Sequence, residues 1–100
     1  MSLTVRFERE ADDEYQDSIG HLEGARTGLG EIFRADVERT LRKVVADPFR
    51  FRRVRGDVRK VYVPRFKHWI YFLIEKKEIV VAAVFHTSRD PESLRERGLL

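Results

Sequence analysis

The order of apolar and polar positions predicts a strand followed by two helices in the first half of the chain. Apolar and polar residues alternate over residues 3–7, and this period of two is typical of a half-buried strand. Apolar residues then recur at helical spacing over residues 9–24 and again over residues 29–46. The connection over residues 24–28 is short, with Thr27 as a possible N-cap. We therefore expect two antiparallel helices that form a hairpin.

The second half of the chain predicts three strands. Residues 58–63 alternate, with Arg59, Val61 and Val63 on one face, and residues 69–75 form the next strand after a break at Pro64. The third strand, residues 78–86, contains seven successive apolar residues. A run that is apolar on both faces suits a central strand that is covered on both sides.

A short helix is expected after the last strand. Asp90 is a suitable N-cap, Pro91 suits the first helical position, and Gly98 suits the position just beyond the last turn. The sequence therefore predicts an α+β fold with the order β-α-α-β-β-β-α. We expect a single domain over residues 1–100, in which the helical hairpin packs on a mostly antiparallel four-stranded sheet.

Composition narrows the class of protein. With 100 residues and 42% apolar residues, the chain has enough material for one modest core. It has no cysteine, which excludes disulfides and thiolate metal sites and makes the cytoplasm the expected location. The first residues are charged too early for a signal peptide, and no apolar run approaches the roughly 20 residues that span a bilayer. We expect no membrane association and no cofactor.

Charge is distributed unevenly along the chain. The formal net charge is +3, yet residues 50–69 alone hold eight basic residues and one acidic residue. Several aromatic residues lie among these arginines. Such a mixture is suited to phosphates or to an acidic protein surface, and the alternative is a solvated face that binds nothing.

Three residues could form a polar site. His86 ends the last strand three residues before Arg89, and an imidazole suits acid-base work. Arg59 could meet Arg89 on one side of the sheet and form a cationic pair for a phosphate or carboxylate. The structural alternatives are a hydrogen bond from His86 to a carbonyl or to Asp90, and surface salt bridges from the arginines to Asp57 or Asp90.

Two further groups of residues are expected to be structural. Trp69, Tyr71 and Phe72 could stack on nucleic-acid bases, but alternate residues of a covered sheet usually fill the core, which is the favoured interpretation. His21 and His68 lie far apart in the sequence, with no carboxylate at a ligand-like spacing. A metal site is therefore not expected.

The order of elements and several runs of residues resemble the RelE/ParE toxin superfamily over nearly the whole chain. The pattern His-x-x-Arg-Asp-Pro at residues 86–91 is most similar to the ParE branch. The runs that carry the resemblance are Val58-Arg59, Pro64-Arg65-Phe66, Trp69-Ile70-Tyr71-Phe72 and residues 83–91.

This resemblance implies a toxin of a bacterial type II toxin-antitoxin pair, neutralised by a cognate antitoxin. ParE toxins are understood to bind DNA gyrase and trap its cleavage complex, whereas RelE toxins cut messenger RNA in the ribosome. The RelE reaction needs a base, an acid and cations, and RNA-cleaving relatives often have a tyrosine near the C-terminus. This sequence has no tyrosine after Tyr71. The favoured interpretation is a protein inhibitor of gyrase rather than an enzyme.

The resemblance also indicates which residues to test. Under the gyrase interpretation, the expected target-binding residues are Arg59, Lys67, His86 and Arg89, and direct nucleic-acid binding is secondary. Under the ribonuclease alternative, Arg59 and Arg89 would hold phosphate and His86 would carry a proton. A third alternative is a basic binding module without toxic activity.

Overall fold

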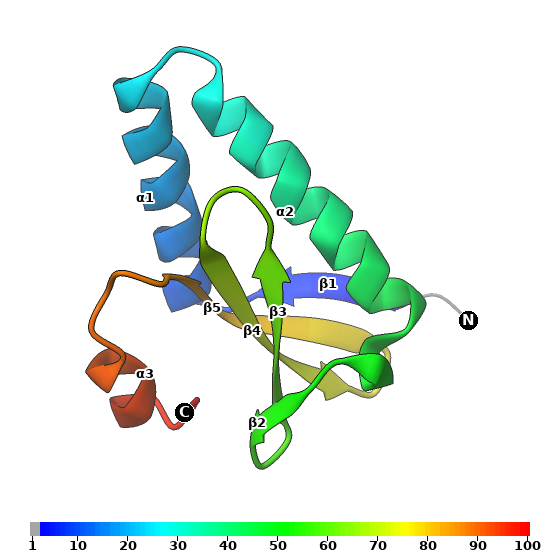
Figure 1. Cartoon of the computed structure of the whole chain (residues 1–100). Helices are drawn as coiled ribbons and strands as arrows, with labels where there is room; N and C mark the ends of the chain where they lie inside the picture. The colour runs from blue at the N-terminus through cyan, green and yellow to red at the C-terminus, as the bar shows by residue number, and fades with distance from the viewer. Residues whose placement is uncertain (1–2) are drawn as a thin grey trace.

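The computed structural model describes residues 3–100 as one α+β domain (Figure 1). Strand β1 and two helices come first, and a 3-10 turn, four further strands and a short helix follow. The predicted class and the helical hairpin are confirmed. The elements are β1 (Thr4–Phe7), α1 (Arg9–Ala25), α2 (Leu29–Ala46), the 3-10 turn (Pro48–Arg50), β2 (Arg53–Arg55), β3 (Val58–Val63), β4 (His68–Glu75), β5 (Glu78–His86) and α3 (Glu92–Glu96).

The sheet has five strands in the order β1-β5-β4-β3-β2, so the predicted count of four was wrong. β1 pairs with β5 in parallel, and the other three pairings are antiparallel. The additional strand is β2, which turns into β3 at Gly56 with a φ of 53°. Its sequence, Arg-Val-Arg, is too short and too charged to give an apolar alternation, although such residues suit an exposed edge strand.

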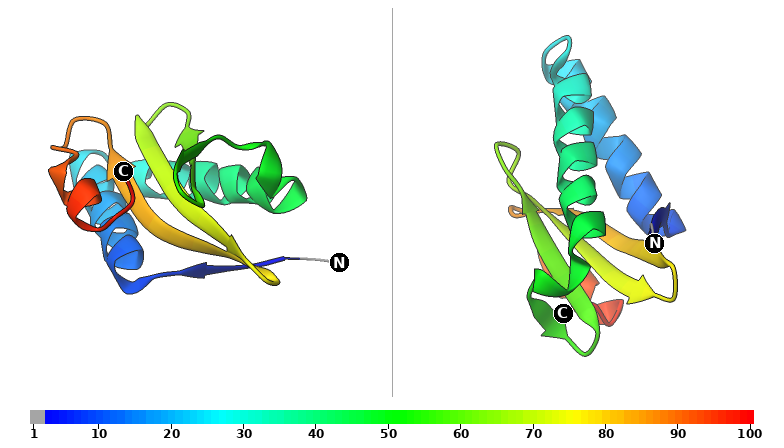
Figure 2. Two further views of the ribbon diagram at one scale, coloured as in Figure 1. Left: turned by 90° about the horizontal axis from the view of Figure 1, so that it is seen from below. Right: turned by 90° about the vertical axis from the view of Figure 1, so that its right-hand side faces the viewer.

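Each face of the sheet packs against helices (Figures 1 and 2). Helix α2 places Phe33 and Val37 against the sheet on the hairpin side, where they contact a core that includes Ile70. On the opposite side, Leu94 of α3 packs in a cluster with Tyr71. β5 lies between β1 and β4, and residues 79–85 are all buried, which confirms the prediction of a covered central strand.

The turn between α1 and α2 differs from the expectation that Thr27 caps the second helix. The N-cap is Gly28, which has a φ of 90° and no side chain to donate or accept. Glu23 takes this role, because its carboxylate accepts the N–H groups of Gly28 at 2.9 Å and Gly30 at 3.1 Å. A Cβ at Gly30 would lie 2.8 Å from the carbonyl oxygen of Ile19, so the close helix crossing requires glycine.

The predicted signals at the C-terminal helix are confirmed in part, because the N-cap residue is Pro91 rather than Asp90 and the helix begins at Glu92. Asp90 Oδ1 accepts the N–H of Glu92 at 3.0 Å, and the helix begins directly after Pro91. Gly98 adopts a φ of 75° beyond the last turn. The chain then folds back, and the N–H of Leu99 donates to the carbonyl of Leu94 at 2.9 Å. This turn directs the end of the chain onto the sheet face that α3 covers.

Candidate functional site

Two histidines face each other at one end of the sheet. His68 begins β4 and His86 ends β5, and the strand register pairs them directly. Their rings are nearly perpendicular, at 88°, with centroids 4.9 Å apart. A serine lies beside each ring, Ser18 of α1 beside His68 and Ser88 beside His86. We call these four residues the histidine cluster.

Hydrogen bonds determine how the protons are arranged in the histidine cluster. His68 Nδ1 lies 2.7 Å from the carbonyl of Phe66, so it carries the proton, and Nε2 can accept from the Ser18 hydroxyl at 3.2 Å. His86 Nδ1 accepts the N–H of Ser88 at 3.0 Å, which leaves the proton of the neutral ring on Nε2. Among residues 3–100, the His86 ring bonds neither a carbonyl nor Asp90, the two partners that the structural alternative offered.

The pKa of His68 is lowered from its ordinary value. Burial is the main cause, since the residue is only 4% exposed and the charged ring would lose its hydration. The hydrogen bond to Phe66 opposes this effect, and the nearby His86 ring adds to it. The buried ring is therefore neutral near pH 7.

A groove with a volume of about 760 Å³ runs between α1 and this end of the sheet. Glu14 lies in its wall and joins three elements: Oε1 accepts the N–H of Val84 at 3.0 Å, while Oε2 lies 3.2 Å from Arg89 and 3.0 Å from Arg97. Arg97 also donates to the carbonyl of Ala82. β1 pairs with β5 only as far as Val81. Beyond it, Glu14 and Arg97 provide the hydrogen-bond partners for the N–H of Val84 and the carbonyl of Ala82. Arg89 thus has a structural role with Glu14, not the expected salt bridge to Asp90.

The loop between β3 and β4 is joined to α2 by a buried carboxylate. Asp36 is 3% exposed and accepts two hydrogen bonds from Arg65, at 3.0 and 2.7 Å, and one from Arg39 at 2.6 Å. The hydrogen bond from Arg65 is the main reason that the pKa of Asp36 is lowered. The same loop holds Lys67, whose side chain is exposed and whose carbonyl accepts the N–H of Thr87 at 2.9 Å. Lys67 therefore lies beside the end of β5.

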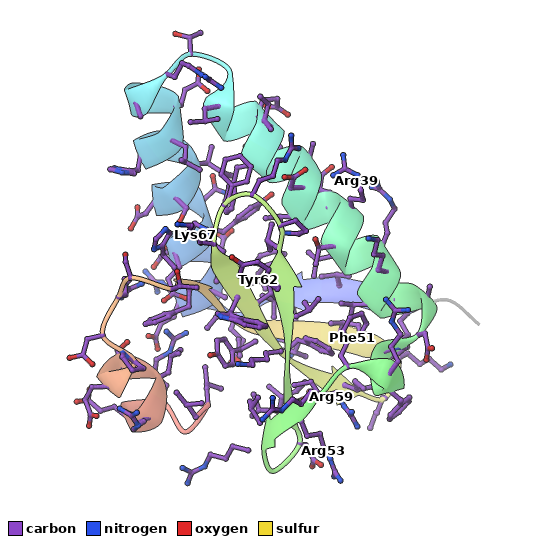
Figure 3. The ribbon with its side chains drawn as sticks, in the orientation of Figure 1. Arg39, Phe51, Arg53, Arg59, Tyr62 and Lys67 are labelled. Atoms are coloured by element: carbon purple, nitrogen blue, oxygen red, sulfur yellow. The ribbon has the colours of Figure 1, made fainter. Side chains whose placement is uncertain are left out.

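Arg59 lies at the other end of β3 (Figure 3). It pairs in register with Phe72, whereas His68 pairs with Val63, so the two positions are separated by about 13 Å along the strand. Its guanidinium donates to the carbonyls of Phe49 at 3.3 Å and Phe51 at 2.7 Å, and the alternative salt bridge to Asp57 is not formed.

The expected meeting of Arg59 and Arg89 was therefore wrong. In an antiparallel meander, the beginning of β3 lies opposite the later part of β4, far from the end of β5. The structure brings Lys67, His86 and Arg89 to one end of the sheet. Arg59 is left at the other.

The sheet face on the α3 side carries a row of aromatic residues. Trp69 pairs in register with Tyr62 on β3 and with Phe85 on β5. The Tyr62 and Trp69 rings lie 4.9 Å apart, Lys60 Nζ lies 3.9 Å from the Trp69 centroid, and the Arg89 guanidinium lies 4.6 Å from that of Phe85. Tyr71 and Phe72 are buried, which confirms the core interpretation for them, but Trp69 is half-exposed.

Sequence reasoning missed the role of His68. Glu75 pairs with Glu78 across a two-residue turn, and this register, continued without interruption, would set His68 opposite Phe85. An irregularity at Ala82 shifts the register by one residue and places His68 opposite His86 instead. The sequence of β5 is apolar throughout residues 79–85, so it has no alternation from which this bulge could be predicted. Glu14 and Arg97 were missed because their partners are distant in sequence.

The described part of the chain offers neither a metal site nor a membrane-spanning helix. Over residues 3–100, no group of three or more His, Asp or Glu residues is arranged to hold a metal ion. None of the helices formed by these residues has the length and apolar character needed to cross a membrane.

Comparisons with known proteins give a likeness in structure. No protein-family model and no curated protein matches the sequence. A mutant of the Escherichia coli toxin RelE in the free state superposes with a TM-score of 0.71 at 17% identity, covering 100% of both chains. A chain of the chromosomal ParDE toxin-antitoxin system of Pseudomonas aeruginosa gives 0.68 at 16% identity, covering 84% of this chain and 95% of that one.

A third structure is the intact E. coli RelBE toxin-antitoxin complex, with a TM-score of 0.63 at 18% identity, covering 87% of this chain and 99% of the matching one. Together with the hairpin, the sheet order and the single compact domain, these likenesses define the fold. The chain has the fold of the RelE/ParE toxin superfamily, as the sequence resemblance predicted. Both branches are similar at nearly equal TM-scores, so the fold does not distinguish them.

Proposed function

We propose that this chain is the toxin of a bacterial type II toxin-antitoxin pair, that it inhibits DNA gyrase in the cytoplasm, and that a cognate antitoxin neutralises it. The fold supports the toxin class, and the ParE-like run at residues 86–91 supports gyrase as the target. The observation that carries the choice is the separation of the residues that RNA cleavage would need.

RNA cleavage requires a base, an acid and cations around one phosphate. Arg59 lies near the start of β3, whereas His68 of β4 pairs with the end of β3. Arg89 is already paired with Glu14. His86 Nδ1 is occupied by Ser88. An inhibitor that binds a protein needs no such assembly, and exposed side chains such as Lys67 are sufficient for it.

A ribonuclease remains the second candidate because of the aromatic row. Trp69 and Tyr62 offer rings on which bases could stack, with Lys60 close enough to hold a phosphate. The likeness to RelE is as strong as the likeness to the ParDE structure. The two functions differ in substrate, so one pair of assays separates them.

The deciding experiment uses the purified chain against both targets. We expect it to reduce supercoiling by gyrase and to leave ribosome-bound messenger RNA intact in a translation extract. RNA cleavage at regular codon positions with normal supercoiling would reverse the assignment. A chain that affects neither target, and that does not arrest growth when expressed, would fit a binding module without toxic activity.

Two lysines offer a matched test of the target surface. Lys67 and Lys76 are both exposed and both lie at positive φ, 55° and 40°, in loops at opposite ends of β4. We expect Lys67→Gln to weaken gyrase inhibition and Lys76→Gln to leave it unchanged, because only Lys67 lies beside His86. Equal inhibition by both variants would remove this end of the sheet from the target surface.

The antitoxin is tested by stability. A partner that binds only the folded chain raises its free energy of unfolding, by about 4 kcal/mol at a thousandfold excess over Kd. We therefore expect co-expression with the product of the neighbouring gene to raise the melting temperature well above that of the free chain. An unchanged melting temperature would argue against that protein as the partner.

A further inference from the structure

Five arginines lie between residues 50 and 59, at the end of the sheet opposite the histidine cluster, and one of them, Arg59, lies against an exposed aromatic ring, Phe49. Phe49 is 69% exposed, the largest exposure among the large hydrophobic residues described. We call this region the arginine turn (Figure 3). It comprises Phe49 with Arg50, Arg52, Arg53, Arg55 and Arg59, which lie on the 3-10 turn, the link that follows it, β2 and the start of β3.

The arginine turn differs from most of the molecule in how its arginines are paired. None of its five arginines forms a salt bridge with a carboxylate of residues 3–100, and four of them are exposed. Seven arginines elsewhere do form one: Arg6, Arg34, Arg39, Arg65, Arg89, Arg95 and Arg97. Arg55 donates to the Leu100 oxygen at 3.2 Å, and the other four arginines of the turn have no anionic partner among the described residues.

The arrangement places like charges next to one another. Arg53 and Arg59 pair in register on neighbouring strands, and like charges directly opposite each other destabilise a sheet. Arg52 approaches Lys60, whose pKa is lowered mainly by burial and further by this second cation. Repulsion of this kind is relieved when an anion binds.

The turn also holds its aromatic ring in a defined position. Arg59 donates to the carbonyls of Phe49 and Phe51, and its guanidinium lies 5.3 Å from the Phe49 ring centroid. Pro48, immediately before, is buried and fixes the start of the turn. An apolar ring that is exposed yet ordered loses little conformational freedom when a ligand covers it.

We propose that the arginine turn binds single-stranded nucleic acid, with phosphates on the exposed arginines and a base stacked on Phe49. Arg53 and Arg55 are two residues apart on β2, on either side of an irregularity in its pairing with β3, so together they offer two charges to one polyanion. A single strand carries a flat base beside every phosphate and therefore satisfies the guanidinium groups and the ring together. An acidic protein segment would neutralise the arginines without needing Phe49.

The experiment measures binding of the full chain to a labelled oligothymidylate of about 20 nucleotides, by fluorescence anisotropy, between about 0.05 and 0.2 M salt. Arg52→Ala with Arg53→Ala should weaken binding about tenfold or more at the lower salt concentration and reduce the salt slope by about 1.4. The control is Arg6→Ala with Arg95→Ala, which removes the same charge from two exposed arginines that have carboxylate partners. It should have much the smaller effect.

Phe49→Ala tests the stacked base. We expect about a fivefold to a hundredfold loss of affinity for the single strand and little change for a duplex of the same length, whose bases are already stacked. Three results would overturn the proposal: no binding to the oligonucleotide at the lower salt concentration, equal losses in the two double variants, or tighter binding to polyglutamate. The last would assign the turn to an acidic protein. No gyrase or antitoxin is present, so the outcome is independent of the proposed function.

Discussion

The two ends of the sheet use charge in opposite ways. At the end with the histidine cluster, Arg65 pairs with the buried Asp36, and Arg89 and Arg97 pair with Glu14. At the arginine turn, none of the five arginines pairs with an Asp or Glu side chain of the described chain, and only Arg55 has a partner near the end of the chain, the Leu100 oxygen. Charges at the first end join loops and helices to the sheet. Those at the second are available to another molecule.

This difference changes how mutations should be interpreted. Replacing a paired arginine removes structure as well as charge, so a loss of toxicity in an Arg89 variant would not by itself identify a contact with the target. Replacing an unpaired, exposed arginine such as Arg53 removes charge alone. The free energy of unfolding of single variants therefore distinguishes the two kinds of charged residue.

The largest expected effect is at Glu14. Glu14→Ala removes the partner of two arginines and the acceptor for the Val84 N–H, so we expect the free energy of unfolding to fall by about 2–3 kcal/mol. In a chain of this length, that corresponds to roughly 10 °C or more in melting temperature. Chemical denaturation measures it. Glu96→Ala, in which an exposed carboxylate of α3 is lost, is the control and should unfold like the parent.

The next effect concerns Asp36 and acid. The folded-state pKa is lowered, so this carboxylate stabilises the fold above its unfolded pKa of about 3.9, and the contribution is lost as pH falls through the folded pKa. Asp36→Ala should cost about 1–3 kcal/mol at pH 7 and progressively less in strong acid. Urea titrations at several pH values measure the deficit. A deficit that is constant down to pH values well below 3.9 would show that the ion pair with Arg65 contributes little.

His68 should give a smaller dependence at milder pH. Its folded-state pKa is lowered, so the unfolded chain takes up a proton first, and stability falls as pH drops from about 6.5 toward the folded pKa. The slope is at most about 1.4 kcal/mol per pH unit. His68→Gln should flatten this part of the profile, whereas His21→Gln, on the exposed side of α1, should keep it. An identical slope in His68→Gln and the parent would contradict the assignment.

The contrast between the two ends also marks how far the sequence could predict the structure. Helix periodicity and the apolar run over residues 79–85 were sufficient for both long helices and the central strand, because burial imposes those patterns directly. Strand β2 was missed because Arg53 and Arg55 carry no apolar signal. The predicted N-cap at Thr27 was wrong because Glu23, near the end of α1, accepts a hydrogen bond from the N–H of Gly28 at the N-terminus of α2.

The candidate site was harder to predict than the fold. His86 and Lys67 lie near each other because the end of β5 and the loop before β4 are adjacent in the meander, but the sequence analysis named both residues without predicting that they are neighbours. The pairing of His68 with His86 depends on the irregularity at Ala82. The separation of Arg59 from Arg89 follows from register, which a list of spacings does not contain. Long-range partners such as Glu14 and Arg97 become visible only in three dimensions.

The smallest expected effect is at Arg53, and its sign is the most informative. Because Arg53 faces Arg59 across the strand pair, Arg53→Ala should raise the free energy of unfolding by up to about 0.5 kcal/mol at low salt. The gain should disappear near 1 M salt, where the screening length is only about 3 Å. Arg6→Ala, which loses salt bridges to Glu75 and Glu78, should change stability in the opposite direction. If Arg53→Ala instead destabilised the chain at low salt, Arg53 would contribute to the stability of the fold. The charge of the arginine turn would then not be explained by ligand binding alone.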